Sequence, residues 1–490
     1  MPLVLDRFRS WNYLLPGLED APIITDLFSG HEAKYHTRSP LIASFSKLCL
    51  VDAVHPPSTF LQQQRVGTPF PSIQKLPAEL IANIFTLCHA TEEDDHRHSV
   101  TGCARVILSH VCSRWRAVIL SMPLVWATIS IRGPKDSSLP RFKAHLERSA
   151  PCPLSLRLSL LPPTLERTVE HGKEIADLVI AHSQRVKLLR LSIYDPRWHS
   201  AFGLVQTAHF PALETLELDL RDWEQGCANA VLGAFSHSLR IQSLLWRGPG
   251  GLPSSSFWMT LTNIEICNSL SLREVHTLLT QCREVVELRI SRITKGSPLD
   301  NEAMVTLHRL ESLSVLTQEA LDCLFESLCT PRLKKLTLRY HHNTSPHNRT
   351  CHAFYSFLAR SDCALESLVL RDDRMSSEAL DQFLRISKLD TLRDLRIESP
   401  VFTDRTFETL TRQVNGDCIL PLLESLCFWR SQSTDGTLGR MAMSRSGGRG
   451  AHAVCDLIRL QTAVDESRLM DRRALDTLKA QGMSIDYESW

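Results

Sequence analysis

The sequence has no long apolar run. No uninterrupted stretch approaches the ~18 apolar residues that a membrane-spanning helix needs, so we expect no transmembrane segment. The first residues contain Asp6 and Arg7 where a signal peptide has its apolar core, which predicts that the chain is not exported. The formal net charge is only +1 over 490 residues, so charge gives no reason to expect nucleic acid or a membrane as partner. These absences predict a cytoplasmic and/or nuclear protein.

Motifs that carry chemistry are also absent. The 15 cysteines include no CxxC pair, which favours reduced thiols that pack in a core over a disulfide framework. There is no GxGxxG, GxxxxGK[ST], HExxH or GxSxG motif. Two polar clusters lack the paired spacing of a zinc site and read as loops: His89, Asp94, Asp95, His96 and His98, and His341, His342, His347, Cys351 and His352. We therefore expect no enzyme, no metal and no cofactor.

What the chain does have is length and apolar content. At 490 residues it exceeds one ordinary core, so it contains either two or more domains or an extended repeat array. Its 43% hydrophobic and 22% charged residues are typical of a folded protein. With no catalytic motif in the sequence, we expect the function to depend on surfaces that bind other molecules.

Two amphipathic helices are predicted near residues 76–126. In the first, Leu80, Ile81, Ile84, Phe85 and Cys88 recur at helical spacing after a proline that suits a first turn. In the second, which the sequence predicts as one helix ending before Met122-Pro123, the apolar side carries Leu108, Val111, Cys112 and Trp115. The pair is either a cap on the following domain or a docking module completed by a partner.

The same residues carry a family resemblance. LPAELIANIF followed by LSHVCSRWRAVILSMPLVW resembles the F-box motif in the form common among large fungal F-box families. The resemblance implies a three-helix module that binds the Skp-type adaptor of a cullin–RING ubiquitin ligase. The adaptor-binding residues that it implies are Leu76, Pro77, Leu80, Ile81, Ile84, Phe85, Leu108, Val111, Cys112, Trp115 and Trp126.

A second pattern fills the middle of the chain. An apolar residue, two others, an apolar residue, one other and an apolar residue recur ten times, mostly about 20 to 29 residues apart, as in leucine-rich repeats. The first positions are Val186, Leu213, Ile241, Leu261, Val285, Leu310, Leu333, Leu365, Leu392 and Leu423. Helical patterns lie between them. No asparagine or cysteine ladder follows the leucines, so the repeats are irregular. The predicted fold is α/β: a small helical F-box module followed by an irregular leucine-rich-repeat solenoid, a curved parallel sheet with outer helices.

The predicted concave face carries charge. Side chains alternate along a strand, so residues between and after the leucines point into the concavity. Five basic residues of the later repeats are predicted to form a strip that holds an acidic or phosphorylated client segment: Arg289, Lys335, Arg339, Arg371 and Arg396. The alternative is a solvated face whose charges pair with Glu287, Asp394 and Glu398.

The predicted organisation has five parts. Residues 1–70 are a segment of unknown role, 71–130 the helical module, 140–430 the solenoid, 431–452 a Ser/Gly/Arg loop and 453–490 a helix and strand that cap the solenoid. The predicted function is the substrate-recognition subunit of a Skp–cullin–F-box-type ligase, with the repeats holding an unknown client protein. The alternative is a non-ligase leucine-rich-repeat scaffold whose helices are a structural cap.

Overall fold

The computed structural model describes most of the chain as two compact units. It covers residues 76–93, 104–133, 138–149, 151–160, 166–198, 209–250, 252, 256–294, 303–318, 321–340, 350–372, 375–398, 401–413, 418–446 and 455–489. The first unit ends at Ile119, and the second runs from Leu120 to the C-terminal end. The predicted segment 1–70 lies outside the described residues.

The first unit is helical. Its described elements are α3 (Ala78–Glu93), α4 (Ala104–Ser109) and α5 (Ser113–Leu120, whose last residue lies at the boundary). Pro77 precedes the first helical residue, and its carbonyl accepts from the backbone N–H groups of Leu80 (3.1 Å) and Ile81 (3.2 Å). The sequence predicted one helix where the structure has α4 and α5. The chain breaks there because the backbone N–H of Trp115 turns to the Cys112 sulfur, at 3.4 Å, in the manner of an N-cap.

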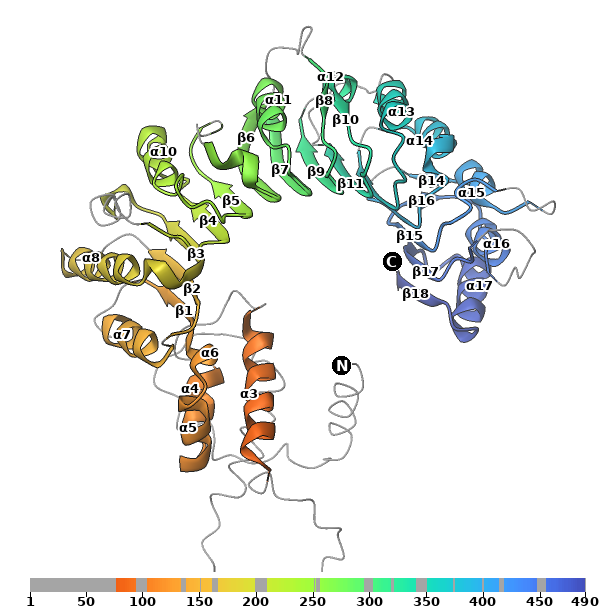
Figure 1. Ribbon diagram of the computed structural model, residues 1–490. Helices are drawn as coiled ribbons and strands as arrows, with labels where there is room; N and C mark the ends of the chain where they lie inside the picture. The colour runs from red at the N-terminus through yellow and green to blue at the C-terminus, as the bar shows by residue number, and fades with distance from the viewer. Residues whose placement is uncertain are drawn as a thin grey trace, which may run out of the picture. The chain divides into compact units, whose positions relative to one another are not determined.

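The second unit is built on a parallel sheet of fourteen strands (Figure 1). Neighbours in the sheet follow chain order, and its strands are β1 (Thr128–Arg132), β2 (Leu154–Leu160), β3 (Val186–Ile193), β4 (Thr215–Asp219), β5 (Ser243–Arg247), β6 (Asn263–Ser271), β7 (Glu287–Thr294), β9 (Ser312–Thr317), β11 (Lys335–Tyr340), β12 (Ser367–Arg371), β13 (Asp394–Ile397), β15 (Ser425–Phe428), β17 (Arg459–Val464) and β18 (Ser484–Ser489). Two short pairs lie apart from it: β8 (Val305–Thr306) with β10 (Leu328–Cys329), and β14 (Phe402–Thr403) with β16 (Ser431–Gln432).

One apolar ladder runs through this sheet. Leu336 of β11, for example, pairs in register with Leu313 of β9 and Leu368 of β12, and all three are buried. The same register joins the apolar positions of all ten predicted repeats, so the predicted leucine-rich-repeat-like solenoid is confirmed. The ladder continues beyond them, through Ile129 of β1 at one end and Ile485 of β18 at the other. The sequence analysis had placed no strand at β1 or β17.

Helices cover the outer side of the arc, and the strands line its inner side (Figure 1). The α-helices are α6 (Pro123–Trp126), α7 (Ser138–Ser149), α8 (Glu166–Ala181), α10 (Gln225–Gly233), α11 (Leu272–Gln281), α12 (Asp322–Ser327), α13 (Thr350–Ser361), α14 (Ser377–Leu384), α15 (Asp404–Leu410), α16 (Thr437–Ser444) and α17 (Leu469–Ala480). Short 3₁₀ helices join some of them: η2 (Ser183–Arg185), η3 (Pro196–Trp198), η5 (Ser256–Thr260) and η6 (Ser387–Leu389). This is the layering that the repeat pattern predicts, because each strand–helix unit buries its apolar side only against its neighbours.

Residues 431–446 differ from the sequence prediction of a loop, because they form β16 and α16. The helix buries Leu438, Met441 and Ala442, which recur at helical spacing. The Ser and Gly residues on either side had hidden this pattern. Residues 447–452 of the predicted loop lie outside the described residues.

A buried arginine ties the last repeats together. Arg445, directly after α16, is fully buried and donates to the backbone carbonyls of Leu410 (2.6 Å), Ile419 (2.7 Å) and Leu420 (3.2 Å). Burial lowers the pKa of Arg445 to about 10, so the side chain stays charged at neutral pH. The guanidinium thus satisfies carbonyls that the loop after α15 leaves without strand or helix partners.

The final helix is capped by a carboxylate. Asp435 accepts from the backbone N–H groups of Met470 and Asp471 at the start of α17, both at 2.9 Å. These bonds, that of Met470 first, lower the pKa of Asp435. Within the described ranges, no helix is both long and apolar enough to cross a membrane.

Candidate functional site

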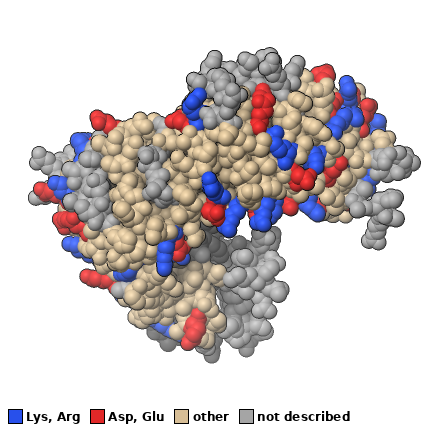
Figure 2. Space-filling view, turned by 45° about the horizontal axis from the view of Figure 1, so that its top comes forward, with Lys and Arg blue, Asp and Glu red and all other residues tan. Residues whose placement is uncertain are grey.

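The inner face of the sheet carries polar side chains in rows. The two apolar residues of each strand point into the core, so the residues beside and between them form rows across the sheet. In the middle row, Ser130, Arg157, Arg190 and Glu217 follow one another on β1 to β4. Basic and acidic side chains are also interspersed on the side of the molecule seen in Figure 2, where the top of Figure 1 comes forward.

Charges in the middle of the sheet are locally paired. Arg221 forms an ion pair with the buried carboxylate of Asp219 at 2.9 Å, and Arg247 approaches the same carboxylate at 3.8 Å. Hydrogen bonding to Asp219 raises the pKa of Arg221. Arg289 binds Glu287 of its own strand at 2.7 Å, and this contact raises its pKa in the same way. These arginines therefore already have acidic partners within the protein.

Between β11 and β13, the arginines outnumber the acids that pair with them. Arg339 of β11 and Arg396 of β13 share one carboxylate oxygen of Glu398, at 2.9 and 3.3 Å. Arg371 of β12 lies directly opposite Arg339 in register, and no described residue gives its side chain an ion pair or hydrogen bond. We call these four residues the Glu398 cluster. Three guanidinium groups around one carboxylate leave a net charge of two, which suits an anionic ligand.

The predicted basic strip is therefore brought together only in part. Arg339, Arg371 and Arg396 meet in the Glu398 cluster. Arg289 is separated from β11 by β9 and paired with Glu287. This pairing, and that of Arg339 and Arg396 with Glu398, is what the solvated-face alternative expects. Lys335 is exposed in a different row, beside Ser312 and Ser367. Asp394, which that alternative gave to an arginine, accepts instead from the Ser367 hydroxyl at 3.0 Å.

The sequence analysis missed a second group of arginines, on β1 to β3. Arg157 and Arg190 lie directly opposite each other, and Arg190 forms an ion pair with Glu217 of β4. Arg132 of β1 is exposed nearby. The alternation of apolar and polar residues in LSLRLSL could have placed Arg157 on the inner face. Strand β1 was not predicted, so there was no reason in the sequence to place Arg132 beside it.

The first unit separates the adaptor candidates of α3 into two sides. Ile81, Phe85 and Cys88 are buried, and the Phe85 ring meets the Trp115 ring edge-on at 5.1 Å. Leu80 is 48% exposed, and Ile84 on the same side is half-buried.

Leu87, which the sequence analysis had not named, is 44% exposed. Positions 80, 84 and 87 recur at i, i+4 and i+7, so they form an apolar stripe on the side of the helix adjacent to the buried one. We call Leu80, Ile84 and Leu87 the outer stripe of α3.

The remaining adaptor candidates differ in exposure. Leu108 and Trp115 are buried, Pro77 is exposed, and three are half-buried: Leu76, Val111 and Cys112. Trp126 belongs to the second unit and is fully buried. Its ring packs edge-on against His145 at 5.2 Å, and the Arg148 guanidinium lies 4.6 Å from the ring centroid. Trp126 thus fills a core where the resemblance implied a contact with a partner.

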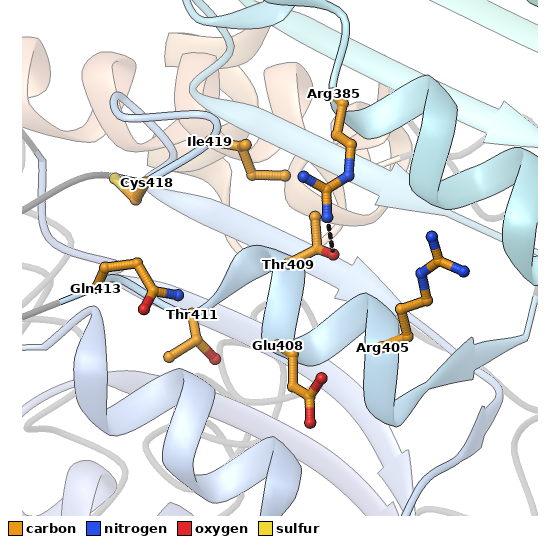
Figure 3. Close-up of a pocket in the computed structure, with 8 residues that line it drawn as sticks. All are labelled: Arg385, Arg405, Glu408, Thr409, Thr411, Gln413, Cys418 and Ile419. Carbon is orange, nitrogen blue, oxygen red and sulfur yellow. Dashed lines mark hydrogen bonds between the residues drawn. The ribbon is translucent and has the colours of Figure 1, made fainter.

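A hollow of about 600 Å³ lies beside α15, on the helical side of the second unit. Its lining is mostly polar: Arg385, Arg405, Glu408, Thr409, Thr411, Gln413, Cys418 and Ile419 (Figure 3). Arg385 donates to the Thr409 hydroxyl at 2.9 Å, and Arg405 reaches the buried Asp381 at 3.2 Å. Both arginines are therefore engaged by the protein itself.

No metal-binding group of three or more His, Cys, Asp or Glu residues occurs among the described residues. The two polar clusters of the sequence lie mainly outside those residues. Cysteines within the described ranges are free thiols. Burial raises the pKa of Cys282 to about 12 and that of Cys363 to about 11, so neither thiol ionises readily.

Comparisons with known proteins give the chain no family. No family model matches it, and no curated protein does. Among solved structures, a protein from Bacteroides fragilis has a TM-score of 0.36 and 14% identity, over 61% of this chain and 84% of that one. TLR13 in complex with ssRNA13 has a TM-score of 0.27 and 13% identity, over 69% of this chain and 51% of that one. Likenesses this distant carry no conclusion about function.

Proposed function

We propose that the chain is the substrate-recognition subunit of a Skp–cullin–F-box-type ubiquitin ligase. In this proposal the first unit docks on the Skp-type adaptor, and the inner face of the sheet holds a client protein. The chain supplies no catalytic group. It accelerates transfer by placing a client lysine near the ubiquitin-charged enzyme, which raises the effective local concentration.

The outer stripe of α3 carries this proposal. The helix already satisfies its own core with Ile81, Phe85 and Cys88, yet it presents a second apolar side to solvent. Burying a fully exposed leucine is worth about 1.5–3 kcal/mol, and Leu80 and Leu87 are 48% and 44% exposed, so a partner that covers both gains roughly the equivalent of one leucine. Leu80 and Ile84 belong to the segment that resembles the F-box motif, and this resemblance is our reason for proposing the adaptor as that partner.

The adaptor is tested by co-purification of the full chain with a Skp-type adaptor. Leu80→Asp is expected to remove the adaptor, because a carboxylate replaces an exposed leucine of the outer stripe. Leu239→Asp is the matched control, since Leu239 is 81% exposed in the second unit. Trp115→Ala is less informative because that ring is buried against Phe85 and its loss destabilises the unit.

The outcomes separate two functions. An adaptor that binds the wild type and Leu239→Asp but not Leu80→Asp supports the ligase subunit. Wild-type chain that retains no adaptor contradicts it and favours the non-ligase scaffold, whose helices serve only as a cap.

The client side of the proposal centres on the Glu398 cluster. Arg371 has no ion pair among the described residues and sits between arginines that share one acid. An acidic or phosphorylated client segment would supply the missing negative charge through bidentate bonds. Double charge reversal, Arg339→Glu with Arg371→Glu, is expected to abolish retention of client proteins on the immobilised chain. Unchanged retention would discard this part.

A further inference from the structure

The arginines of β1 to β3 lie in an arrangement that the protein alone does not favour. Arg157 and Arg190 face each other on neighbouring strands, and like charges in that position destabilise a sheet. Only Arg190 is neutralised, by Glu217. The Nε atom of Arg157 is buried without a hydrogen-bond partner, and its side chain has no ion pair among the described residues. A buried, unsatisfied charged donor is costly.

The same arrangement occurs twice in the sheet. In the Glu398 cluster, Arg339 and Arg371 also face each other in register, and again only one of the two is neutralised. Elsewhere, Arg289 is paired with Glu287, and Arg221 and Arg247 share the buried carboxylate of Asp219. In both facing pairs the second arginine has no acid among the described residues, which leaves its charge available to an external anion.

The surroundings of Arg157 suit an oxyanion. Ser130 of β1 lies directly opposite Arg157, and Ser159 lies directly opposite Arg132. The hydroxyl groups can donate, and the two guanidinium groups on adjacent strands offer planar forks of N–H donors. The described inner-face positions of β1, β2 and β3 contain no acidic side chain.

We propose that Arg132, Arg157 and Arg190 form a binding site for a phosphate monoester. Three guanidinium groups and the Glu217 carboxylate leave a net charge of two. A phosphate monoester, with a charge between about −1.5 and −2 at neutral pH, matches this better than one carboxylate. The site lies apart from the predicted client strip and does not depend on whether the first unit binds an adaptor.

Calorimetric titration of the full chain with inorganic phosphate tests the site, with succinate as the carboxylate probe at equal ionic strength. To remove the other arginine pair, the titration is run in an Arg371→Met background. Phosphate is expected to bind there, and Arg157→Met is expected to weaken binding about tenfold or more. Arg289→Met is the matched control and should leave binding unchanged, because Arg289 already binds Glu287.

The Glu217→Gln variant distinguishes a phosphate-binding role of the arginines from a purely structural one. It removes the acid that neutralises Arg190 and is expected to tighten phosphate binding several-fold. Arg157→Met should leave the melting temperature unchanged or higher, because it removes a like-charge contact. Phosphate binding that is absent, that survives Arg157→Met, or that Glu217→Gln fails to tighten would overturn the site. Succinate binding as tight as phosphate would overturn the assignment of the ligand.

Discussion

Replacing Arg445 by Met tests the most unusual polar group of the solenoid. The guanidinium is fully buried, and it donates to three backbone carbonyls, those of Leu410, Ile419 and Leu420. Methionine keeps much of the volume and removes every donor. The carbonyls of Leu410 and Ile419 then lose their bonds to the guanidinium, whereas that of Leu420 keeps the backbone N–H of Leu423 at 3.2 Å. Each buried group left unsatisfied costs about 1–3 kcal/mol.

The desolvation cost of the buried charge disappears at the same time and offsets part of this loss. The carbonyls left behind are uncharged, so we expect the free energy of unfolding to fall by about 1–3 kcal/mol after this offset. Because repeats are stabilised chiefly by their neighbours, the loss should concentrate in the last repeats.

Urea denaturation gives the magnitude, and hydrogen exchange of the backbone between α15 and β15 gives the location. Arg440→Met, on an exposed position of the same helix, is the control and should stay within about 0.5 kcal/mol of the wild type. An Arg445→Met variant as stable as this control, with unchanged exchange near Leu420, would refute the structural role of the buried guanidinium.

Four further substitutions probe the fold. Leu336→Ala in the apolar ladder should cost about 2–5 kcal/mol in urea denaturation, and a smaller loss would mean that the ladder collapses around the cavity. Gly172→Ala should destabilise by about 1–3 kcal/mol, because the added Cβ would lie 2.0 Å from the Trp198 ring. Gly233→Ala, with no atom within 4 Å of its added Cβ, should be neutral or stabilising, and equal melting temperatures for the two variants would contradict this packing. The lowered pKa of Asp435 means that its capping contribution is present above the ordinary value of 3.8 and is lost as pH falls through the lower value. Asp435→Asn should therefore flatten the pH dependence of hydrogen exchange at the start of α17 below about pH 4, and an unchanged pH profile would show that the cap does not matter there.

Much of the fold could be predicted because the buried strands leave a rigid spacing in the sequence. Two apolar residues of every strand must enter one core, so Leu336 and its counterparts recur regardless of the irregular helices between them. The two missed strands have weaker signals. TISIR of β1 directly follows a helical segment, and RLQTAV of β17 places a threonine, Thr462, at a core position.

The candidate sites were less predictable because charge pairing depends on which strands are neighbours. Arg339 and Glu398 are 59 residues apart, and their contact spans β12. The sequence showed that both are charged and in later repeats, but not that two arginines share one acid. Likewise the alternate apolar positions of α3 showed a wide stripe, whereas only packing separates Phe85 on the buried side from Leu87 on the outer one.

The regular strand order also fixes the distance between the two arginine pairs. Neighbouring strands are about 4.8 Å apart, so the arginine pair on β2 and β3 lies roughly 34 Å along the sheet from the pair on β11 and β12. An extended polypeptide covers that distance with about ten residues. A ligand with anionic groups at this separation can occupy both pairs at once and gains the advantage of an intramolecular second contact, whereas a shorter one must choose between them.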